Sequence, residues 1–217
     1  MLQAVLFDLD GTMADSDPIH LGVFQVMLGE QGLVVDEAMF RDRICGRTNQ
    51  AILNDLLPHF SQAEALAFSE AKEQRFRDLA RSQLQPVAGL MPLLDWIQAR
   101  GLGTAVVTNA PRLNAEFMLQ GLGLSARFDH IILGEDLPRA KPDPLPYQTA
   151  LDKLGLEPSA ALVFEDSPSG IQAAVAAGIP TVGVMSNHGA ERLLGLGARM
   201  AIANFTDPRL AELGLLT

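Results

Sequence analysis

A chain of 217 residues, 48% of them hydrophobic and 19% charged, has the composition of a packed globular protein, which excludes disordered, collagen-like and low-complexity classes. It is long for one average domain and short for two, so we expect one core with an insertion. Sixteen Lys plus Arg against 26 Asp plus Glu give a formal charge of −10. This balance argues against nucleic-acid binding through a basic surface, while a small anionic substrate held by a local cluster is still allowed.

The sequence predicts a soluble, cytoplasmic protein. Cys45 is the single cysteine and can form no intrachain disulfide, as is usual in a reducing compartment. Asp8 and Asp10 interrupt the first apolar stretch, which therefore resembles neither a signal peptide nor an anchor. The longest apolar stretch, residues 173–185, is too short to span a membrane. Nothing in the sequence indicates the oligomeric state.

Short apolar runs alternate with segments that carry helix signals. Runs at residues 3–7, 104–107, 130–133, 160–164, 181–184 and 200–203 are typical of buried strands. Between several of them, Pro111, Pro144 and Pro168 mark helix starts, while Gly155 and Gly178 mark helix ends. This alternation predicts an α/β fold, a Rossmann-like three-layer core with a parallel sheet.

Residues 17–85 break the alternation, because they contain no strand-like run and have the pattern of several amphipathic helices. We expect a helical cap domain there, inserted into a core formed by residues 1–16 and 86–217. The insertion follows the first strand directly, at the carboxyl end of a parallel sheet, where open α/β sheets bind ligands. It is therefore placed to cover the site as a lid.

Acidic pairs follow two of the predicted strands. Asp8 and Asp10 come after the first, and Glu165 with Asp166 after another. Carboxylates brought together at neighbouring strand ends repel one another and favour a bound cation. Oxygen ligands without nearby His or Cys favour Mg²⁺ over Zn²⁺. The alternative, that each acidic residue only caps the next helix, explains one pair more easily than two.

Two further strand ends carry groups suited to phosphate. Thr108 and Asn109 follow a strand with a hydroxyl and an amide, and Lys141 precedes a helix. Lysine is scarce, with only Lys72, Lys141 and Lys153 in the chain, so Lys141, which is flanked by prolines, is not part of a general scatter of surface charge. Taken singly, a residue such as Thr108 is more often a helix cap than a phosphate ligand, and a lone lysine such as Lys141 is more often a surface charge.

The order of these motifs resembles the haloacid dehalogenase-like hydrolase superfamily. The motifs are Asp8-Leu9-Asp10-Gly11-Thr12, Thr108, Lys141-Pro142-Asp143-Pro144 and Glu165-Asp166-Ser167-Pro168-Ser169-Gly170. The position of the predicted cap is similar to that of the subfamily of phosphoglycolate phosphatases, sugar-phosphate phosphatases and β-phosphoglucomutase. The resemblance implies a phosphatase acting on a small phosphorylated metabolite.

The resemblance also implies catalytic roles. Asp8 would attack phosphorus and form an aspartyl-phosphate. Asp10 would protonate the leaving alcohol and then deprotonate the water that hydrolyses the intermediate. Thr108, Asn109 and Lys141 would hold the transferring phosphoryl oxygens.

The implied cofactor is Mg²⁺. Its ligands would be the Asp8 carboxylate, the Asp10 main-chain carbonyl and Asp166, with Glu165 bound directly or through water. Such an ion would cancel the repulsion between the nucleophile and an anionic substrate.

Other members of the superfamily remain as alternatives. Asp10 argues against dehalogenases and phosphonatases, which lack it, and the cap lysine Lys72 has the surroundings of a solvated surface charge. A phosphomutase is the main alternative, although its Ser-Lys-Asn run is replaced here by Ala110-Pro111-Arg112. His20 and Arg47 resemble hinge and cap positions that bind substrate in such enzymes, and Arg47 would then meet a second anionic group. The alternatives are that Arg47 forms a salt bridge within the cap and that His20 is a helix residue facing the hinge. A non-catalytic protein that binds phosphate and Mg²⁺ is a further alternative.

Overall fold

A computed structural model of the chain describes residues 1–216 and contains one sheet of six parallel strands. The strand order is β3-β2-β1-β4-β5-β6. The strands are β1 (Ala4–Phe7), β2 (Gly103–Thr108), β3 (His130–Leu133), β4 (Ala161–Glu165), β5 (Thr181–Val184) and β6 (Met200–Ile202). Each end lies within one residue of the predicted strand, and the predicted α/β fold is confirmed.

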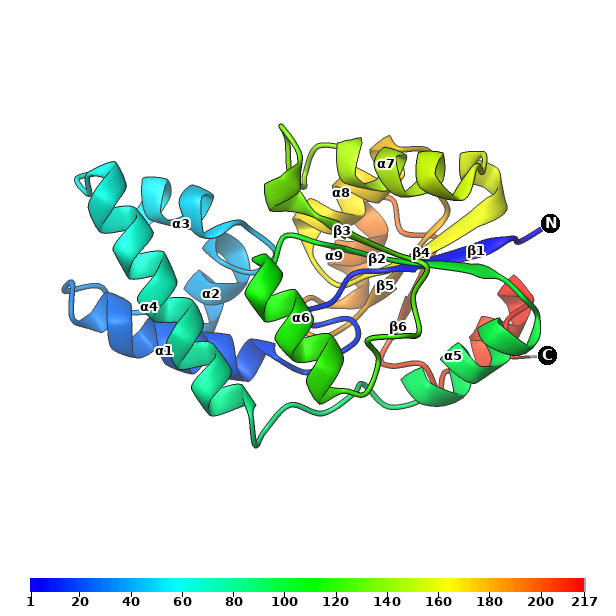
Figure 1. Cartoon of the computed structure of the whole chain (residues 1–217), viewed down its shortest axis with the longest axis horizontal. Helices are drawn as coiled ribbons and strands as arrows, with labels where there is room; N and C mark the ends of the chain where they lie inside the picture. The colour runs from blue at the N-terminus through cyan, green and yellow to red at the C-terminus, as the bar shows by residue number, and fades with distance from the viewer. Residues whose placement is uncertain (217) are drawn as a thin grey trace.

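Helices cover both faces of the sheet and make the three layers seen in Figure 1. One face packs against α5 (Leu90–Ala99), α6 (Arg112–Gly121) and the 3-10 helix Pro208–Leu213. The other packs against α7 (Leu145–Leu154), α8 (Pro168–Ala176) and α9 (Ala190–Gly195). Short 3-10 turns at Gly134–Asp136 and Pro158–Ala160 complete the connections.

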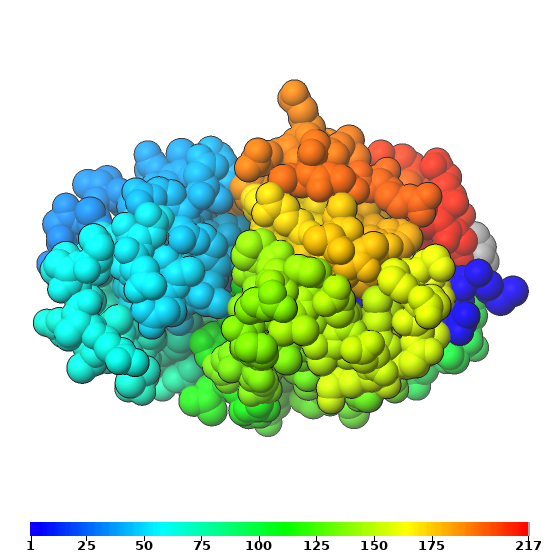
Figure 2. All heavy atoms as spheres, turned by 90° about the horizontal axis from the view of Figure 1, so that it is seen from above, coloured from blue at the N-terminus to red at the C-terminus, as the bar shows by residue number. Residues whose placement is uncertain are grey.

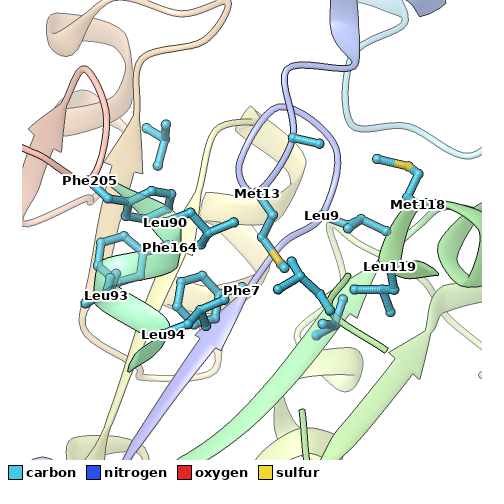
Figure 3. Close-up of a cluster of buried hydrophobic side chains, with 14 of the residues drawn as sticks. Phe7, Leu9, Met13, Leu90, Leu93, Leu94, Met118, Leu119, Phe164 and Phe205 are labelled. Atoms are coloured by element: carbon cyan, nitrogen blue, oxygen red, sulfur yellow. The ribbon is translucent and has the colours of Figure 1, made fainter. Parts of the chain in front are cut away.

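The central strand β1 is buried on both faces, which explains its unbroken apolar sequence. Successive side chains of a strand point to opposite faces, so Val5 and Phe7 enter one core and Ala4 and Leu6 the other. Phe7 stacks on Phe164 with ring centroids 5.3 Å apart. Figure 3 shows this larger core, in which side chains of β1, β4 and α5 meet.

Four helices between β1 and α5 form the helical insertion, which is α1 (Asp17–Gly29), α2 (Glu37–Arg43), α3 (Asn49–Leu56) and α4 (Gln62–Ala80). They pack around a separate apolar cluster that includes Phe24, Phe40 and Leu53. The insertion lies at one end of the molecule, blue to cyan in Figure 2, against the core. The exact domain boundaries at residues 17 and 85 stay a prediction.

The carboxyl ends of the parallel strands face the insertion. The chain leaves β1 toward the insertion, whereas both termini lie at the far end of the sheet (Figure 1). β1 lies between β2 and β4, so connections leave it in opposite directions at a topological switch point, where open α/β sheets bind ligands. Within residues 1–216, no helix is both long and apolar enough to cross a membrane.

Phe164→Ala tests the contribution of the aromatic core. Phe164 is fully buried against Phe7 and Phe205. Its removal leaves a cavity, so we expect the free energy of unfolding in urea to fall by about 3–5 kcal/mol. Leu113→Ala, at a side chain that is 63% exposed, is the control and should change stability by less than about 0.5 kcal/mol. Equal effects of the two substitutions would contradict this account of the core.

Candidate active site

A buried lysine joins three strand ends. Lys141 precedes α7, and its Nζ atom donates hydrogen bonds to Asp8 Oδ1 at 2.7 Å, to the Val107 carbonyl at 2.6 Å and to Glu165 Oε1 at 2.5 Å. Asp8 directly follows β1, Val107 lies in β2, and Glu165 is the last residue of β4. Burial opposes the charge on Lys141, but Asp8 and Glu165 outweigh it and raise the pKa of the ammonium. The lysine is therefore charged beside Asp8.

The hydrogen-bonding capacity of Glu165 is largely used by protein donors. Oε1 accepts from Lys141 and from the Tyr147 hydroxyl at 2.8 Å. Oε2 accepts from the backbone N–H groups of Asp166 and Ser167 and from the Ser167 hydroxyl. A carboxylate held in this way fixes the position of Lys141.

Asp8 and Asp166 are the carboxylates with the stronger demand for a cation. Burial, followed by neighbouring acidic charges, raises the pKa of both groups well above the ordinary value. Asp166 accepts hydrogen bonds from the Thr12 hydroxyl at 3.0 Å and the Ser186 hydroxyl at 2.9 Å. One oxygen each from Asp8, Glu165 and Asp166 lie within 4.8 Å of one another. This all-oxygen set fits a hard divalent cation.

A second cluster adjoins Asp166 and contains Asp17 and Cys45. Burial and the charges of Asp10 and Asp15 raise the pKa of Asp17 to about 7. Cys45 is buried, and its Sγ atom lies 3.9 Å from Asp166 Oδ2. Asp17 is not among the site residues predicted from the sequence.

Asn109 connects the strand end to two loops. Its amide hydrogen-bonds both the N–H and the carbonyl of Lys141, and its Nδ2 donates to the Gly46 carbonyl at 3.1 Å. The Thr108 hydroxyl accepts from the backbone N–H of Ala110 at 3.0 Å. Thr108, Asn109 and Lys141 all line one pocket with Asp8.

Gly46 is where the insertion approaches the end of this pocket that contains Asn109 and Lys141. Its carbonyl accepts hydrogen bonds from Asn109 and from the Ser169 hydroxyl of α8, the latter at 2.6 Å. Its φ of +72° favours glycine, and an added Cβ would lie 2.4 Å from Ser167 Cβ. A residue without a side chain is therefore required for this close approach.

Asp10 is held by Ser16, which directly precedes α1, and by His20 on α1. Its Oδ1 accepts from the Ser16 hydroxyl at 2.7 Å and lies 3.1 Å from His20 Nε2. His20 stacks on Phe76, and its Nδ1 lies 3.0 Å from Lys72 Nζ. Because an ammonium group only donates, Nδ1 is the acceptor and Nε2 carries the proton that is donated to Asp10.

The expectation for Lys72 is wrong. The side chain is 4% exposed and faces the pocket from α4, bonded to His20 and to Glu73 Oε1 at 2.9 Å. The helix turns this side chain inward against Phe24 and Phe76, a contact that adjacent acidic residues in the sequence do not reveal. The chain has only three lysines, and this scarcity, which drew attention to Lys141, could also have indicated from the sequence that Lys72 lies at the site.

Arg47 lines the pocket, but its guanidinium is bound within the insertion. Nη1 donates to the Arg43 carbonyl at 2.7 Å and to Asp55 Oδ2 at 2.9 Å, and Nη2 donates to the Ala51 carbonyl at 3.0 Å. The alternative of a salt bridge within the cap describes this geometry. His20, the other predicted cap contact, lines the pocket as a partner of Asp10.

Comparisons of the sequence and of the structure with known proteins point to the same protein family. Residues 5–184 match the model of the haloacid dehalogenase-like hydrolases. The chain is 34% identical to a validoxylamine A 7'-phosphate phosphatase of Streptomyces hygroscopicus subsp. limoneus, over 99% of both chains. It is 32% identical to a phosphoglycolate phosphatase of Rhodospirillum rubrum, over 95% of this chain and 89% of the relative. A family IA hydrolase from Entamoeba histolytica has a similar structure, with a TM-score of 0.87, 29% identity and coverage of 98% and 97%.

Mg²⁺ should stabilise the folded protein, because the buried carboxylates Asp8 and Asp166 lack a sufficient counter-charge. At a hundredfold excess over Kd the gain is about 2.7 kcal/mol. Since their pKa values are raised in the folded state, that state retains protons that the unfolded chain releases, and a metal must displace these protons. The rise in Tm with Mg²⁺ should therefore grow with pH.

Thermal unfolding at about pH 6 and pH 8, with and without Mg²⁺, measures this effect. Asp166→Asn should remove most of the Mg²⁺-dependent rise, whereas Asp152→Asn, an exposed position on α7, should retain it. A rise that is the same at both pH values and persists in Asp166→Asn would place the metal elsewhere.

Proposed function

The chain belongs to the haloacid dehalogenase-like hydrolases and is a phosphoric monoester hydrolase, and on this basis we propose that it hydrolyses a small phosphorylated metabolite in a Mg²⁺-dependent reaction with Asp8 as the nucleophile. The observation that carries the proposal is the buried Asp8 carboxylate 2.7 Å from Lys141 Nζ, at the carboxyl end of β1 and facing a pocket. A carboxylate at a switch point with a fixed cation beside it is suited to attack an anionic phosphoryl group.

In the first step an Asp8 oxygen forms a bond to phosphorus, while the bond from phosphorus to the substrate oxygen breaks. The product is an aspartyl-phosphate and an alcohol that needs one proton. Lys141, held by Glu165 and the Val107 carbonyl, supplies a positive charge beside the reacting carboxylate. Thr108 and Asn109 line the same end and supply a hydroxyl and an amide for phosphoryl oxygens.

The donor set supports Mg²⁺ as the cofactor. Asp8, Asp166 and the Asp10 main-chain carbonyl would hold the ion, and Glu165, whose oxygens already accept from protein donors, would reach it through water. Bound Mg²⁺ would supply charge neutralisation between the nucleophile and the phosphoryl oxygens. Thr12 and Ser186 orient Asp166 for this role.

Asp10 is the proposed acid and base. Burial disfavours its charge, but hydrogen bonds from His20 and Ser16 outweigh burial and lower the pKa of Asp10. In this arrangement the carboxylate is ready to take a proton from water during hydrolysis of the aspartyl-phosphate. To protonate the leaving alcohol it must exchange these partners for the substrate. Ser16 directly precedes the insertion and His20 lies on its first helix, so substrate entry and acid placement are coupled there.

Hydrolysis is favoured over phosphoryl transfer to a second sugar position. The loop after β2 offers no free cation to grip a second phosphate, since Ala110 and Pro111 are uncharged. Arg112 Nη2 is bound to both oxygens of Asp136 at 2.8 and 2.6 Å. The proposed reaction therefore ends with water as the acceptor.

Asp8→Asn tests the nucleophile. The amide keeps the shape of the side chain and removes the attacking oxygen's charge, so turnover of p-nitrophenyl phosphate should fall by about 10³-fold or more. The control is Asp15→Asn, an exposed carboxylate in the same loop, which should retain turnover. Activity of Asp8→Asn within a few-fold of the parent would contradict nucleophilic attack by Asp8.

Asp10→Asn tests the acid role through the leaving group. An alkoxide requires a proton and nitrophenolate does not, so kcat/KM for glycerol phosphate should fall by about 10²–10⁴-fold and that for p-nitrophenyl phosphate much less. The ratio kcat/KM reports steps up to formation of the aspartyl-phosphate and so excludes the later need for a base. Equal losses on the two substrates would show that Asp10 donates no proton to the leaving group.

A further inference from the structure

Besides Asp8 and Lys141, the pocket is lined by residues of the insertion and of α6, and we assign the leaving group of the substrate to this second part, called here the leaving-group end. Three polar side chains converge there: Asn49 at the start of α3, Glu73 on α4 and Asn114 on α6. Phe24 and Ile52 line the same pocket and add apolar surface. This end is distinct in chemistry from the end that contains Asp8 and Lys141.

Every cationic side chain that lines the pocket is already paired within the part of the chain that the structure describes. Lys141 is bound to Asp8 and Glu165, Lys72 to Glu73, and Arg47 to Asp55 and two carbonyls. Side-chain exposure is 2% for Lys141 and 4% for Lys72, so their pairs are shielded from water and hold strongly. The leaving-group end therefore has no uncompensated positive charge.

Glu73 is the centre of this end. Its Oε1 accepts from Lys72 and from Asn49 Nδ2 at 2.6 Å, and its Oε2 accepts from Asn114 Nδ2 at 2.6 Å. The carboxylate is 6% exposed, and Lys72, His20 and Asn49 outweigh the cost of burial and lower the pKa of Glu73. It is thus a negative charge whose hydrogen-bonded partners join the insertion to the core.

We propose that this pocket selects phosphate monoesters whose leaving group is a neutral or amine-bearing polyol, and that Glu73, with Asn49 and Asn114, disfavours a second anionic group. The selection rests on the proposed phosphatase activity and deepens it. Amide and carboxylate groups are good partners for hydroxyl and ammonium groups. A substrate carboxylate or second phosphate would instead lose its water at an end where Glu73 already neutralises Lys72, so that no unpaired cation among the described residues that line the pocket replaces that water.

The apolar part of the lining fits the same class of leaving group. Phe24 and Ile52 offer a surface to the C–H groups of a carbon skeleton. Arg47, the cation that would otherwise suit a distant anionic group, is turned to Asp55. The combination of an apolar wall with acceptor and amide groups is typical of sites that bind hydroxylated carbon chains and rings.

Matched substrate pairs test the proposal directly. 2-Hydroxyethyl phosphate and 2-phosphoglycolate differ by an alcohol against a carboxylate at the same distance from phosphorus, as do sorbitol 6-phosphate and 6-phosphogluconate at the end of a longer chain. With Mg²⁺ present, the wild-type enzyme should show a kcat/KM at least about tenfold higher for the neutral member of each pair, a difference of about 1.4 kcal/mol. Equal values, or a preference for the carboxylates, would overturn the proposal.

Glu73→Gln locates the source of the preference. The amide keeps the size of the side chain and leaves Lys72 without its charge partner, so the ratio of neutral to anionic kcat/KM should fall by about fivefold or more. The control is Glu70→Gln, an exposed position on the same helix, which should leave the ratio unchanged. A ratio in Glu73→Gln that equals the wild-type ratio, with Tm and p-nitrophenyl phosphate turnover preserved, would remove Glu73 from the selection.

The test separates the selection from the reaction on which it rests. If p-nitrophenyl phosphate and both pairs all fail to release phosphate, the proposed phosphatase chemistry is wrong. If the aryl phosphate is hydrolysed but the carboxylate members are the better substrates, the chemistry stands and the selection is wrong. The wild-type comparison decides the proposal even if Glu73→Gln does not fold.

Discussion

The burial of the Lys141 ammonium is the constraint on which the site depends. A charge removed from water must be matched by acceptors at good geometry, and here a carbonyl and two carboxylates supply them from three neighbouring strands. Those acceptors can meet at one point only if β2, β1 and β4 are adjacent and in register. The same interaction therefore links the order of strands in the sheet to the position of the Asp8 carboxylate.

Glu165 shows how this constraint spreads outward. Its side chain accepts donors from Tyr147 on α7 and from the first residues leading into α8. An added Cβ at Gly170 would lie 1.8 Å from Glu165 Oε1, so α8 approaches the carboxylate more closely than a side chain would allow. Glu165, at the end of a strand, thus contacts two helices of the same layer, and these contacts fix the helices next to the pocket.

The sequence predicted the core and the strand-end residues well because their positions follow from local patterns. A strand's carboxyl end is set by where its apolar run stops, so Asp8, Thr108 and Asp166 could be placed without knowing any long-range contact. No comparable local pattern tells which side chains of the insertion face the pocket. Whether Lys72 or Arg47 faces the substrate depends on how four helices rotate against one another and against the sheet, and that packing assigned Lys72 to His20 and Arg47 to Asp55.

The contact at Gly46 has a consequence for how such an enzyme diversifies. The insertion binds Asn109 and Ser169 through a main-chain carbonyl, a group that every amino acid possesses, at a position where the absence of a side chain is the only demand. The attachment is thus independent of the chemistry of the flanking side chains. A substitution at Arg47, whose guanidinium is bound within the insertion, therefore leaves this main-chain contact in place. Substitutions in the insertion can therefore change which leaving groups are accepted, while the main-chain contact of Gly46 with Asn109 and Ser169 is kept.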